Sequence, residues 1–388
     1  MGRFMFIRSN SWGRADLSWS RVMERLLKAA ELKGHEISFI STNGYSGMEY
    51  WTEEKSKEIQ EKHKDIIYDI DITYTIPMNF PSRFLKSSKV KIGRFDYESS
   101  ILPKNFAQNI NTPDYIVGSS DFVLDIFANA GADLKKLRKI PSGVDLSVFN
   151  QNGKKLDLSK LGIGKDTFVF LSIAEPHYRK QLDKLLTMFC EVFTSQDNVA
   201  LIIKTKFPEK GAPSFEMDIR PHLADLKRKH GKNIPNIKII PGFVSSLAEL
   251  YRSAHVFLLP TVGEGWGMPF LEAMASGNIV LAPDYGGQLE FLNKKNSLLC
   301  PVEICDALPQ EQYGSVDASK LDFLSAKKIP KGQVGRPKEK DFKDLMSYSF
   351  QNYDNLKKQF NEEMTRTANK FTWDFAAQEM INIAKGTK

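Results

Sequence analysis

One stretch of the sequence, residues 254–291, constrains the fold more than any other. It begins with the apolar run AHVFLLP, which has the length of a buried strand. Three glycines in the five residues 263–267 follow, and they let the backbone turn sharply and approach a ligand closely. Pro269 suits the first turn of a helix, Gly277 suits its end, and NIVLAP predicts the next buried strand. Strand, glycine loop, helix and strand form half of a doubly wound α/β nucleotide-binding unit.

Two carboxylates stand around that glycine loop, Glu264 within it and Glu272 in the helix that follows. We expect the loop at the carboxyl end of a strand, where such sheets bind ligands, and the free N–H groups of the helix favour a diphosphate there. Ionised carboxylates are also strong acceptors for the hydroxyl pairs of sugars. Either glutamate alone is explained equally well as a partner of the helix dipole. The functional hypothesis therefore depends on the pair within this string.

The string EGWGMPFLE, residues 264–272, resembles the Glu-x7-Glu signature of the family-four retaining glycosyltransferases, which have the two-domain GT-B fold. In that family the first glutamate faces hydroxyls of the donor sugar, and the second hydrogen-bonds the ribose of the nucleotide. The resemblance implies these roles for Glu264 and Glu272. It also implies that the rest of the loop lines the donor site: Gly265, Trp266, Gly267 and Met268.

Basic residues follow the strand predicted at 166–174. Arg179 and Lys180 match the basic pair that the family places on the donor diphosphate, although the arginine that many members carry just after the strand is absent. VALIIKTK puts Lys204 at the end of the next strand, where some subgroups carry a second lysine. Fixed cations would stabilise the negative charge that develops on a leaving nucleoside diphosphate. A solvated surface lysine is the alternative for Lys180.

A further loop, Gly242-Phe243-Val244, resembles the family loop whose backbone contacts the base of the nucleotide. Phe243 and Val244 are therefore candidate nucleotide contacts, without indicating which base is bound. His255 begins an apolar strand, and we expect it to be a structural histidine.

The first half of the chain predicts another Rossmann-like domain. A strand at 3–7, a helix at about 17–32 and the strand HEISFI are similar to the opening unit of GT-B transferases. In those enzymes the loop after the first strand carries glycines that contact donor phosphate or acceptor. Here it carries Trp12, Gly13 and Arg14, with one glycine only. These three residues are candidate acceptor-side contacts.

Residues 95–103 resemble a family segment that faces the interdomain cleft near the acceptor. This makes Glu98 a further acceptor-side candidate, and a helix-capping acid is its equal alternative. Asp69-Ile70-Asp71 resembles the metal-binding Asp-x-Asp of a different transferase class, but GT-B enzymes do not use that motif.

IPSGVD at 140–145 looks like the family's crossing between domains. We expect an acceptor-binding domain over residues 1–145, completed by a last helix at 373–388, and a nucleotide-sugar domain over 146–372. The predicted fold class is α/β, with two Rossmann-like doubly wound domains facing across a cleft. The polar segment 305–337 has no clear period and is interpreted as a loop.

The composition of the chain bears on its cellular location. The formal net charge of +7 over 388 residues indicates a solvated basic surface, or otherwise an anionic acceptor or a membrane surface. No apolar run approaches the roughly 20 residues needed to cross a bilayer, and the start has no signal-peptide core. Three cysteines without paired spacing argue against a disulfide framework. We expect a cytoplasmic protein, with a peripheral location at the inner membrane face as the alternative.

These observations predict a retaining glycosyltransferase that uses a nucleotide-sugar, most simply a UDP- or GDP-sugar, and an acceptor that is a glycan, a glycolipid or a small molecule. The resemblance implies no metal and no cofactor, and it gives Glu264, Arg179, Lys180 and Lys204 positioning and electrostatic roles. The alternatives are a GT-B transferase acting on modified nucleic-acid bases, a hydrolase or epimerase of this fold, and a non-catalytic protein that binds sugar nucleotides or nucleic acid.

Overall fold

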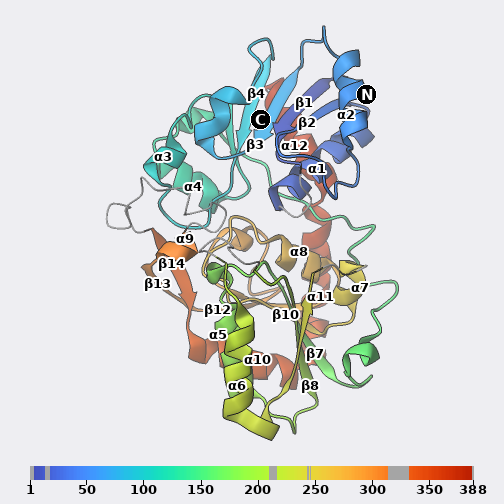
Figure 1. Ribbon diagram of the computed structural model, residues 1–388, viewed down its shortest axis with the longest axis vertical. Helices are drawn as coiled ribbons and strands as arrows, with labels where there is room; N and C mark the ends of the chain where they lie inside the picture. Colours follow the sequence, from blue (N-terminus) through green and yellow to red (C-terminus); the bar gives the residue numbers. More distant parts are fainter. Residues whose placement is uncertain are drawn as a thin grey trace. The chain divides into compact units, whose positions relative to one another are not determined.

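The computed structural model describes residues 4–13, 18–208, 216–242, 244, 246–312 and 332–386. The chain divides into two compact units, whose elements are labelled in Figure 1. The first unit comprises Met1–Tyr97, Ile101–Gly143 and Lys370–Lys388, and the second comprises Glu98–Ser100 and Val144–Asn369. The chain therefore joins the second unit briefly at Glu98 and returns to the first unit for its last helix.

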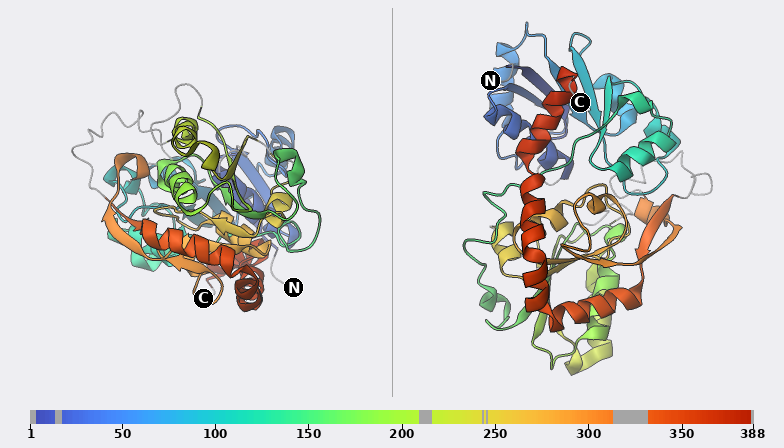
Figure 2. Two further views of the ribbon diagram at one scale, coloured as in Figure 1. Left: turned by 90° about the horizontal axis from the view of Figure 1, so that it is seen from below. Right: turned by 180° about the vertical axis from the view of Figure 1, so that it is seen from behind.

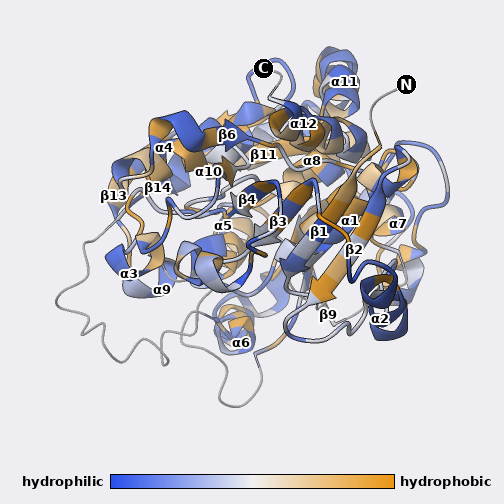
Figure 3. Cartoon of the chain, turned by 90° about the horizontal axis from the view of Figure 1, so that it is seen from above, coloured by the Kyte–Doolittle hydropathy of each residue, from blue (hydrophilic) through white to orange (hydrophobic). Residues whose placement is uncertain are grey.

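The first unit is built on a parallel six-stranded sheet in the order β2-β1-β3-β4-β5-β6. Its strands are β1 (Phe6–Ser11), β2 (Glu36–Ser41), β3 (Ile70–Tyr74), β4 (Val90–Arg94), β5 (Tyr115–Gly118) and β6 (Leu137–Lys139). Its helices are α1 (Ser18–Leu32), α2 (Glu53–Lys62), α3 (Lys104–Ala107), α4 (Asp121–Asn129) and α12 (Trp373–Lys385). Every residue of β3 is buried, as expected for a central parallel strand. Figure 3 shows the contrast between the apolar strand β2 and the hydrophilic helix α2.

A buried ion pair secures the centre of this sheet. Asp71 on β3 is fully buried, and its two carboxylate oxygens accept hydrogen bonds from Arg8 on β1 at 2.8 and 2.9 Å. Burial raises the pKa of Asp71, and the neighbouring Arg8 opposes that shift. Asp69 pairs with Lys89 at 2.8 Å and accepts from the backbone N–H of Phe6. Both acids of the Asp-x-Asp sequence therefore join strands and loops to one another.

Helix α12 packs along α1 within the first unit (Figure 2). The Thr372 side chain caps α12 by accepting from the N–H of Phe375, and Trp373 is buried in the first turn. Gly143 passes directly beside this turn, because a Cβ atom on Gly143 would lie 2.2 Å from the backbone nitrogen of Trp373. Only a glycine fits this point of the IPSGVD sequence.

The second unit is built on another parallel six-stranded sheet, in the order β12-β11-β10-β7-β8-β9. Its strands are β7 (Phe168–Ile173), β8 (Val199–Thr205), β9 (Asn236–Pro241), β10 (Val256–Leu258), β11 (Ile279–Pro283) and β12 (Leu298–Cys300). Its longer helices are α5 (Leu182–Val192), α6 (Ile219–His230), α7 (Leu247–Arg252), α8 (Met268–Ala275), α10 (Glu339–Gln351) and α11 (Tyr353–Lys370). The strand order reverses between β7 and β10, and open α/β sheets bind ligands at the carboxyl ends of strands at such a point.

A two-stranded antiparallel sheet of β13 (Val302–Asp306) and β14 (Gln333–Pro337), called the hairpin below, occupies part of the segment interpreted as a loop. The short helix α9 (Pro309–Gln312) follows β13. The loop interpretation is wrong for these residues, because partners distant in sequence complete strands too short to show a clear period. Residues 313–331 of the same segment lie outside the described residues.

The prediction of two Rossmann-like α/β domains is confirmed by these two sheets. In the part of the chain that the structure describes, no helix is both long and apolar enough to cross a membrane.

The close contact at Gly143 generates a stability prediction. Gly143→Ala should lower the free energy of unfolding by about 1–3 kcal/mol, since its methyl group overlaps backbone atoms that cannot move aside cheaply. Urea unfolding followed by tryptophan fluorescence would measure the change. The matched control is Gly164→Ala, whose Cβ would lie 3.2 Å from the Thr167 hydroxyl, a side-chain atom. Equal stability of the two variants would contradict the steric argument.

Candidate functional site

Two segments that follow adjacent strands meet at the carboxyl edge of the second sheet. The 3-10 turn η4 (Tyr178–Lys180) comes after β7, and the glycine loop 263–267 comes after β10. The N–H of Val262 donates to the carbonyl of Arg179 at 2.9 Å, so the two segments are joined through their backbones. They lie at the position where the strand order reverses.

Glu264 is the centre of a buried charged cluster in this place. Its side chain is 7% exposed, and its Oε1 atom accepts from Arg179 Nη1 at 3.0 Å and from Thr261 Oγ1 at 2.8 Å. Lys180 Nζ donates to the same oxygen. Arg179 Nη1 also donates to the carbonyl of Gly263 at 3.0 Å. The sequence-predicted residues Glu264, Arg179 and Lys180 are therefore brought into direct contact.

The charge state of Glu264 follows from its neighbours. Burial alone would raise the pKa of its carboxyl group, but the Lys180 ammonium and the Arg179 guanidinium outweigh burial and hold the pKa below the ordinary value of 4.5. Two buried cations side by side would repel each other without this carboxylate. Glu264 is thus ionised at neutral pH and compensates both.

Arg179 also pairs with a second carboxylate. Its Nη2 atom lies 3.1 Å from Oε1 of Glu98, which belongs to the short segment that groups with the second unit. The backbone approach is close, since a Cβ atom on Gly263 would lie 2.1 Å from the carbonyl oxygen of Glu98. Glu98 is not a helix cap, because α3 begins after Pro103. Glu98, the acceptor-side candidate, thus contacts Arg179, a cation predicted for the donor diphosphate.

Glu272 lies on α8, beyond the glycine loop. Its Oε2 atom accepts from the hydroxyl of Tyr251 at 3.0 Å. Burial first, and then the nearby Glu272 carboxylate, raise the pKa of Tyr251 well above its ordinary value, so the tyrosine remains a donor. This hydrogen bond orients the half-buried Glu272 side chain from the direction of α7.

The loop itself has the backbone that its glycines allow. Gly267 has φ +86° and caps α8, which begins at Met268. A side chain there would be strained and would also crowd the Phe270 ring. Trp266 is 4% exposed and packs at 5.0 Å on the ring of Phe291. The Trp266 ring therefore supports the loop from the core, whereas Gly265 lies in the turn and Met268 is the first residue of α8.

Lys204 lies near the carboxyl end of β8, at the same edge of the sheet. Its carbonyl accepts from the N–H of Ala174 at 3.1 Å. Burial lowers the pKa of its ammonium group, and Glu175 opposes the shift. Among the described residues Lys204 forms no ion pair, whereas Lys206 pairs with Glu175 at 3.0 Å. The structure does not bring Lys204 into contact with the Glu264 cluster.

The remaining candidates are spread over both units. Trp12 follows β1 in the first unit and stacks on Trp19 with 5.1 Å between ring centroids. The N–H of Gly13 donates to the side-chain oxygen of Asn43 at 2.8 Å. Val244 is half-buried after β9. Arg14 and Phe243 lie outside the described residues.

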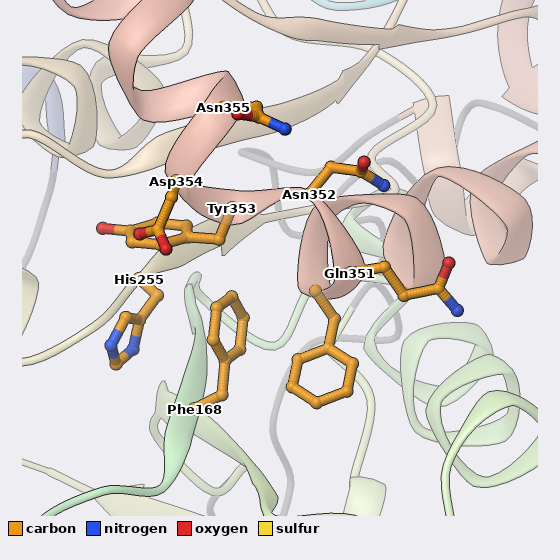
Figure 4. Close-up of a pocket in the computed structure, with 8 residues that line it drawn as sticks. Phe168, His255, Gln351, Asn352, Tyr353, Asp354 and Asn355 are labelled. Carbon is orange, nitrogen blue, oxygen red and sulfur yellow. The ribbon is translucent and has the colours of Figure 1, made fainter.

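A pocket of about 480 Å³ opens at the opposite edge of the second sheet (Figure 4). Phe168 and His255, which stand at the amino ends of β7 and β10, line it together with the junction of α10 and α11. The Nδ1 atom of His255 accepts from the N–H of Val169 at 3.0 Å, and burial lowers the pKa of the ring. This confirms the expectation of a structural histidine. The pocket is far along the sheet from the carboxyl ends at which such sheets bind ligands.

Several residues of the site have no clear signal in the sequence. Thr261 lies in the loop after β10 and Tyr251 lies on α7, and only their hydrogen bonds to Glu264 and Glu272 reveal a role for them. Glu311 and Arg336 contact Gln181, next to the basic pair, from more than a hundred residues away. Among the described residues, no group of three or more His, Cys, Asp and Glu could hold a metal ion.

Comparison with protein families gives a match within the second unit. Residues 165–311 match the family model described as glycosyl transferases group 1. The chain is 29% identical over 178 residues to the alpha-monoglucosyldiacylglycerol synthase of Streptococcus pneumoniae, covering 44% of this chain and 37% of that protein. It is 29% identical over 175 residues to the D-inositol 3-phosphate glycosyltransferase of Geodermatophilus obscurus, covering 44% and 38%. The matches thus span less than half of these curated relatives.

Solved structures resemble the chain along nearly its whole length. HepE of Anabaena in complex with UDP-glucose has a TM-score of 0.65 at 12% identity, covering 98% of this chain and 100% of that one. The sucrose-phosphate synthase of Thermosynechococcus elongatus has a TM-score of 0.68 at 13% identity, covering 98% of each chain. At such identities the likeness establishes the fold.

The buried cluster generates a pH-dependent prediction. Glu264→Gln should lower the free energy of unfolding at pH 7 by about 3 kcal/mol, because it leaves the buried Lys180 ammonium without its carboxylate and leaves Arg179 with Glu98 alone. The pKa of Glu264 is depressed on folding, so its stabilising contribution is complete above the ordinary value of 4.5 and is lost as the pH falls through the folded value. The difference in free energy of unfolding between wild type and Glu264→Gln should therefore become smaller below about pH 4.5.

Urea unfolding at neutral and acidic pH would measure this difference. Glu303→Gln, at an exposed carboxylate on β13, is the control and should differ little from wild type at either pH. A difference for Glu264→Gln that stays constant or widens in acid would refute the role of the ionised carboxylate.

Proposed function

We propose that this chain transfers a sugar from a nucleotide donor to a hydroxyl acceptor with retention of configuration. The proposal starts from the match of residues 165–311 to the glycosyl transferases group 1 family model and from the GT-B fold. The observation that carries the proposal is the Arg179–Lys180–Glu264 cluster at the reversal of strand order. Two fixed cations at that position suit the diphosphate of a donor.

The cluster supplies a chemical role for each residue. Arg179 and Lys180 stabilise the charge that grows on the nucleoside diphosphate as its bond to the sugar breaks. Glu264 holds both cations in place, and its acceptor capacity on the second oxygen serves a hydroxyl of the donor sugar. Glu272, oriented by Tyr251, accepts from the ribose hydroxyls.

The transfer itself requires no covalent enzyme intermediate. The bond between the anomeric carbon and the leaving phosphate oxygen breaks, and the acceptor oxygen bonds to that carbon on the same face. The acceptor proton passes to the leaving phosphate. Arg179, Lys180 and Lys204 then act by stabilising the leaving group and by holding the reactants in place.

The relatives support a choice of substrate class. HepE was solved in complex with UDP-glucose, and this favours a UDP-sugar as donor for the present chain. One relative is named as a synthase of alpha-monoglucosyldiacylglycerol, and the other as a glycosyltransferase of D-inositol 3-phosphate. We therefore propose a glycolipid, a glycan or a small polyol as acceptor, and peripheral contact with the cytoplasmic membrane face where the acceptor is a lipid.

Donor binding can be tested without knowing the acceptor. A thermal-shift panel of UDP-, GDP- and ADP-sugars should show stabilisation by one class, because a ligand that binds only the folded state raises its stability. Glu272→Ala should reduce that shift by removing the ribose contact. Glu303→Ala should leave it unchanged. Equal shifts for Glu272→Ala and wild type would remove Glu272 from the nucleotide site.

Lys204 provides a second test, of turnover. Lys204→Ala should lower kcat for hydrolysis or transfer of the bound donor by about 100-fold, since it removes one cation from the developing charge. Lys227→Ala, at an exposed lysine on α6, is the matched control. Steady-state release of nucleoside diphosphate would measure both, and near-normal kcat in Lys204→Ala would exclude that lysine from the site.

A further inference from the structure

The residue directly after the basic pair has an unusual backbone. Gln181 has φ +53° and ψ +40°, in the left-handed region, although it is not a glycine. Within the described ranges only Asn109 shares this property. Side chains disfavour this region, so a residue stays there only when its surroundings hold it. The conformation of Gln181 turns the chain from η4 into α5 and thereby sets the direction of Lys180.

A buried carboxylate on α9, the short helix that follows β13, holds Gln181. Its Nε2 atom donates to Oε1 of Glu311 at 3.0 Å and to the carbonyl of Tyr178 at 2.8 Å. Glu311 is 2% exposed, and Leu308 N–H donates to its other oxygen at 2.9 Å. Both carboxylate oxygens of Glu311 therefore accept hydrogen bonds, and this fixes the side chain that holds Gln181.

Arg336 on β14 completes the arrangement. Its two terminal nitrogens each donate to one oxygen of Glu311, both at 3.0 Å. This two-point geometry fixes the plane of the carboxylate as well as its position. Arg336 Nη1 lies 3.4 Å from Oε1 of Gln181, so the guanidinium and the carboxylate hold opposite ends of the Gln181 amide.

The same hairpin supports the loop that carries Glu264. The N–H of Gly335 donates to the carbonyl of Val262 at 3.0 Å. Val262, Val334 and Ala307 form a small buried cluster. A Cβ atom on Gly335 would lie 2.3 Å from the ring of Tyr285, so the hairpin approaches this region as closely as a glycine permits. One element therefore contacts both segments of the charged cluster.

We infer that Glu311 and Arg336 are positioning residues for the donor diphosphate, acting through the left-handed conformation of Gln181 on Arg179 and Lys180. The inference rests on the proposed function, since it assigns a task to residues around the same donor site. Loss of the Glu311 carboxylate frees Gln181 to return to the right-handed region. The backbone on which Lys180 and Arg179 stand then rotates away from Glu264.

The test compares a nucleoside diphosphate with its nucleoside. UDP, GDP and ADP are titrated calorimetrically into the wild-type protein, and the tightest of them is then compared with its matching nucleoside in each variant. Glu311→Ala should weaken the diphosphate about tenfold and leave the nucleoside unchanged, because only the diphosphate uses the basic pair. Glu303→Ala on the same hairpin is the control and should change neither.

A rescue separates positioning from general support. In Glu311→Ala combined with Gln181→Gly, most of the diphosphate affinity should return, since glycine adopts the left-handed conformation without help. Gln181→Val with Glu311 intact should reproduce the loss, because a β-branched residue resists that conformation. This second variant keeps the test informative where Glu311→Ala fails to fold.

The outcomes distinguish two failures. The positioning role is wrong if Glu311→Ala weakens the affinity for diphosphate and nucleoside equally. It is also wrong if folded Gln181→Val binds the diphosphate as tightly as the wild type. Either result leaves the donor function unaffected. A wild-type protein that binds none of the three diphosphates overturns the donor function, and the inference with it.

Discussion

The described part of the site depends on one buried carboxylate. Arg179 and Lys180 lie side by side beneath the surface, where two uncompensated cations would repel each other and resist desolvation. Glu264 accepts from both, and so it ties the turn after β7 to the loop after β10. Glu264 compensates both buried cations, and Glu98 adds a second carboxylate for Arg179. A donor would therefore meet cations that are already oriented.

Arg179 in this cluster is already desolvated and already paired with carboxylates before any donor binds. Glu98 and Glu264 occupy Arg179 from two directions, so an arriving diphosphate must share or replace these contacts. The cost of rearranging them is smaller than that of bringing a free cation out of water, because the guanidinium is already desolvated and held. The turn at Gln181, held by Glu311 on α9 and Arg336 on β14, restrains the backbone that carries both cations.

Local sequence was sufficient where a residue's role depends on its immediate neighbours. The glycines before α8 predicted a turn, and Gly267 at φ +86° caps that helix. Apolar strand-length runs predicted two parallel α/β sheets, which the strand order confirms. Glu264, Arg179 and Lys180 were predicted from their resemblance to family motifs that follow two strands, and they are in contact. Their chemical roles remain proposals.

The sequence by itself determined the α/β class, the glycine loop and the residue types at the strand ends, because periodicity, φ requirements and strand position are local properties. Only the tertiary structure decided that Glu98 pairs with Arg179, that residues 302–306 and 333–337 form a hairpin, and that Glu311 and Arg336 restrain Gln181. Those contacts join residues distant in the chain, and short segments carry no period that reveals their partners. These ion pairs and the restraint on the Gln181 backbone therefore form only when folding brings segments distant in the chain into contact.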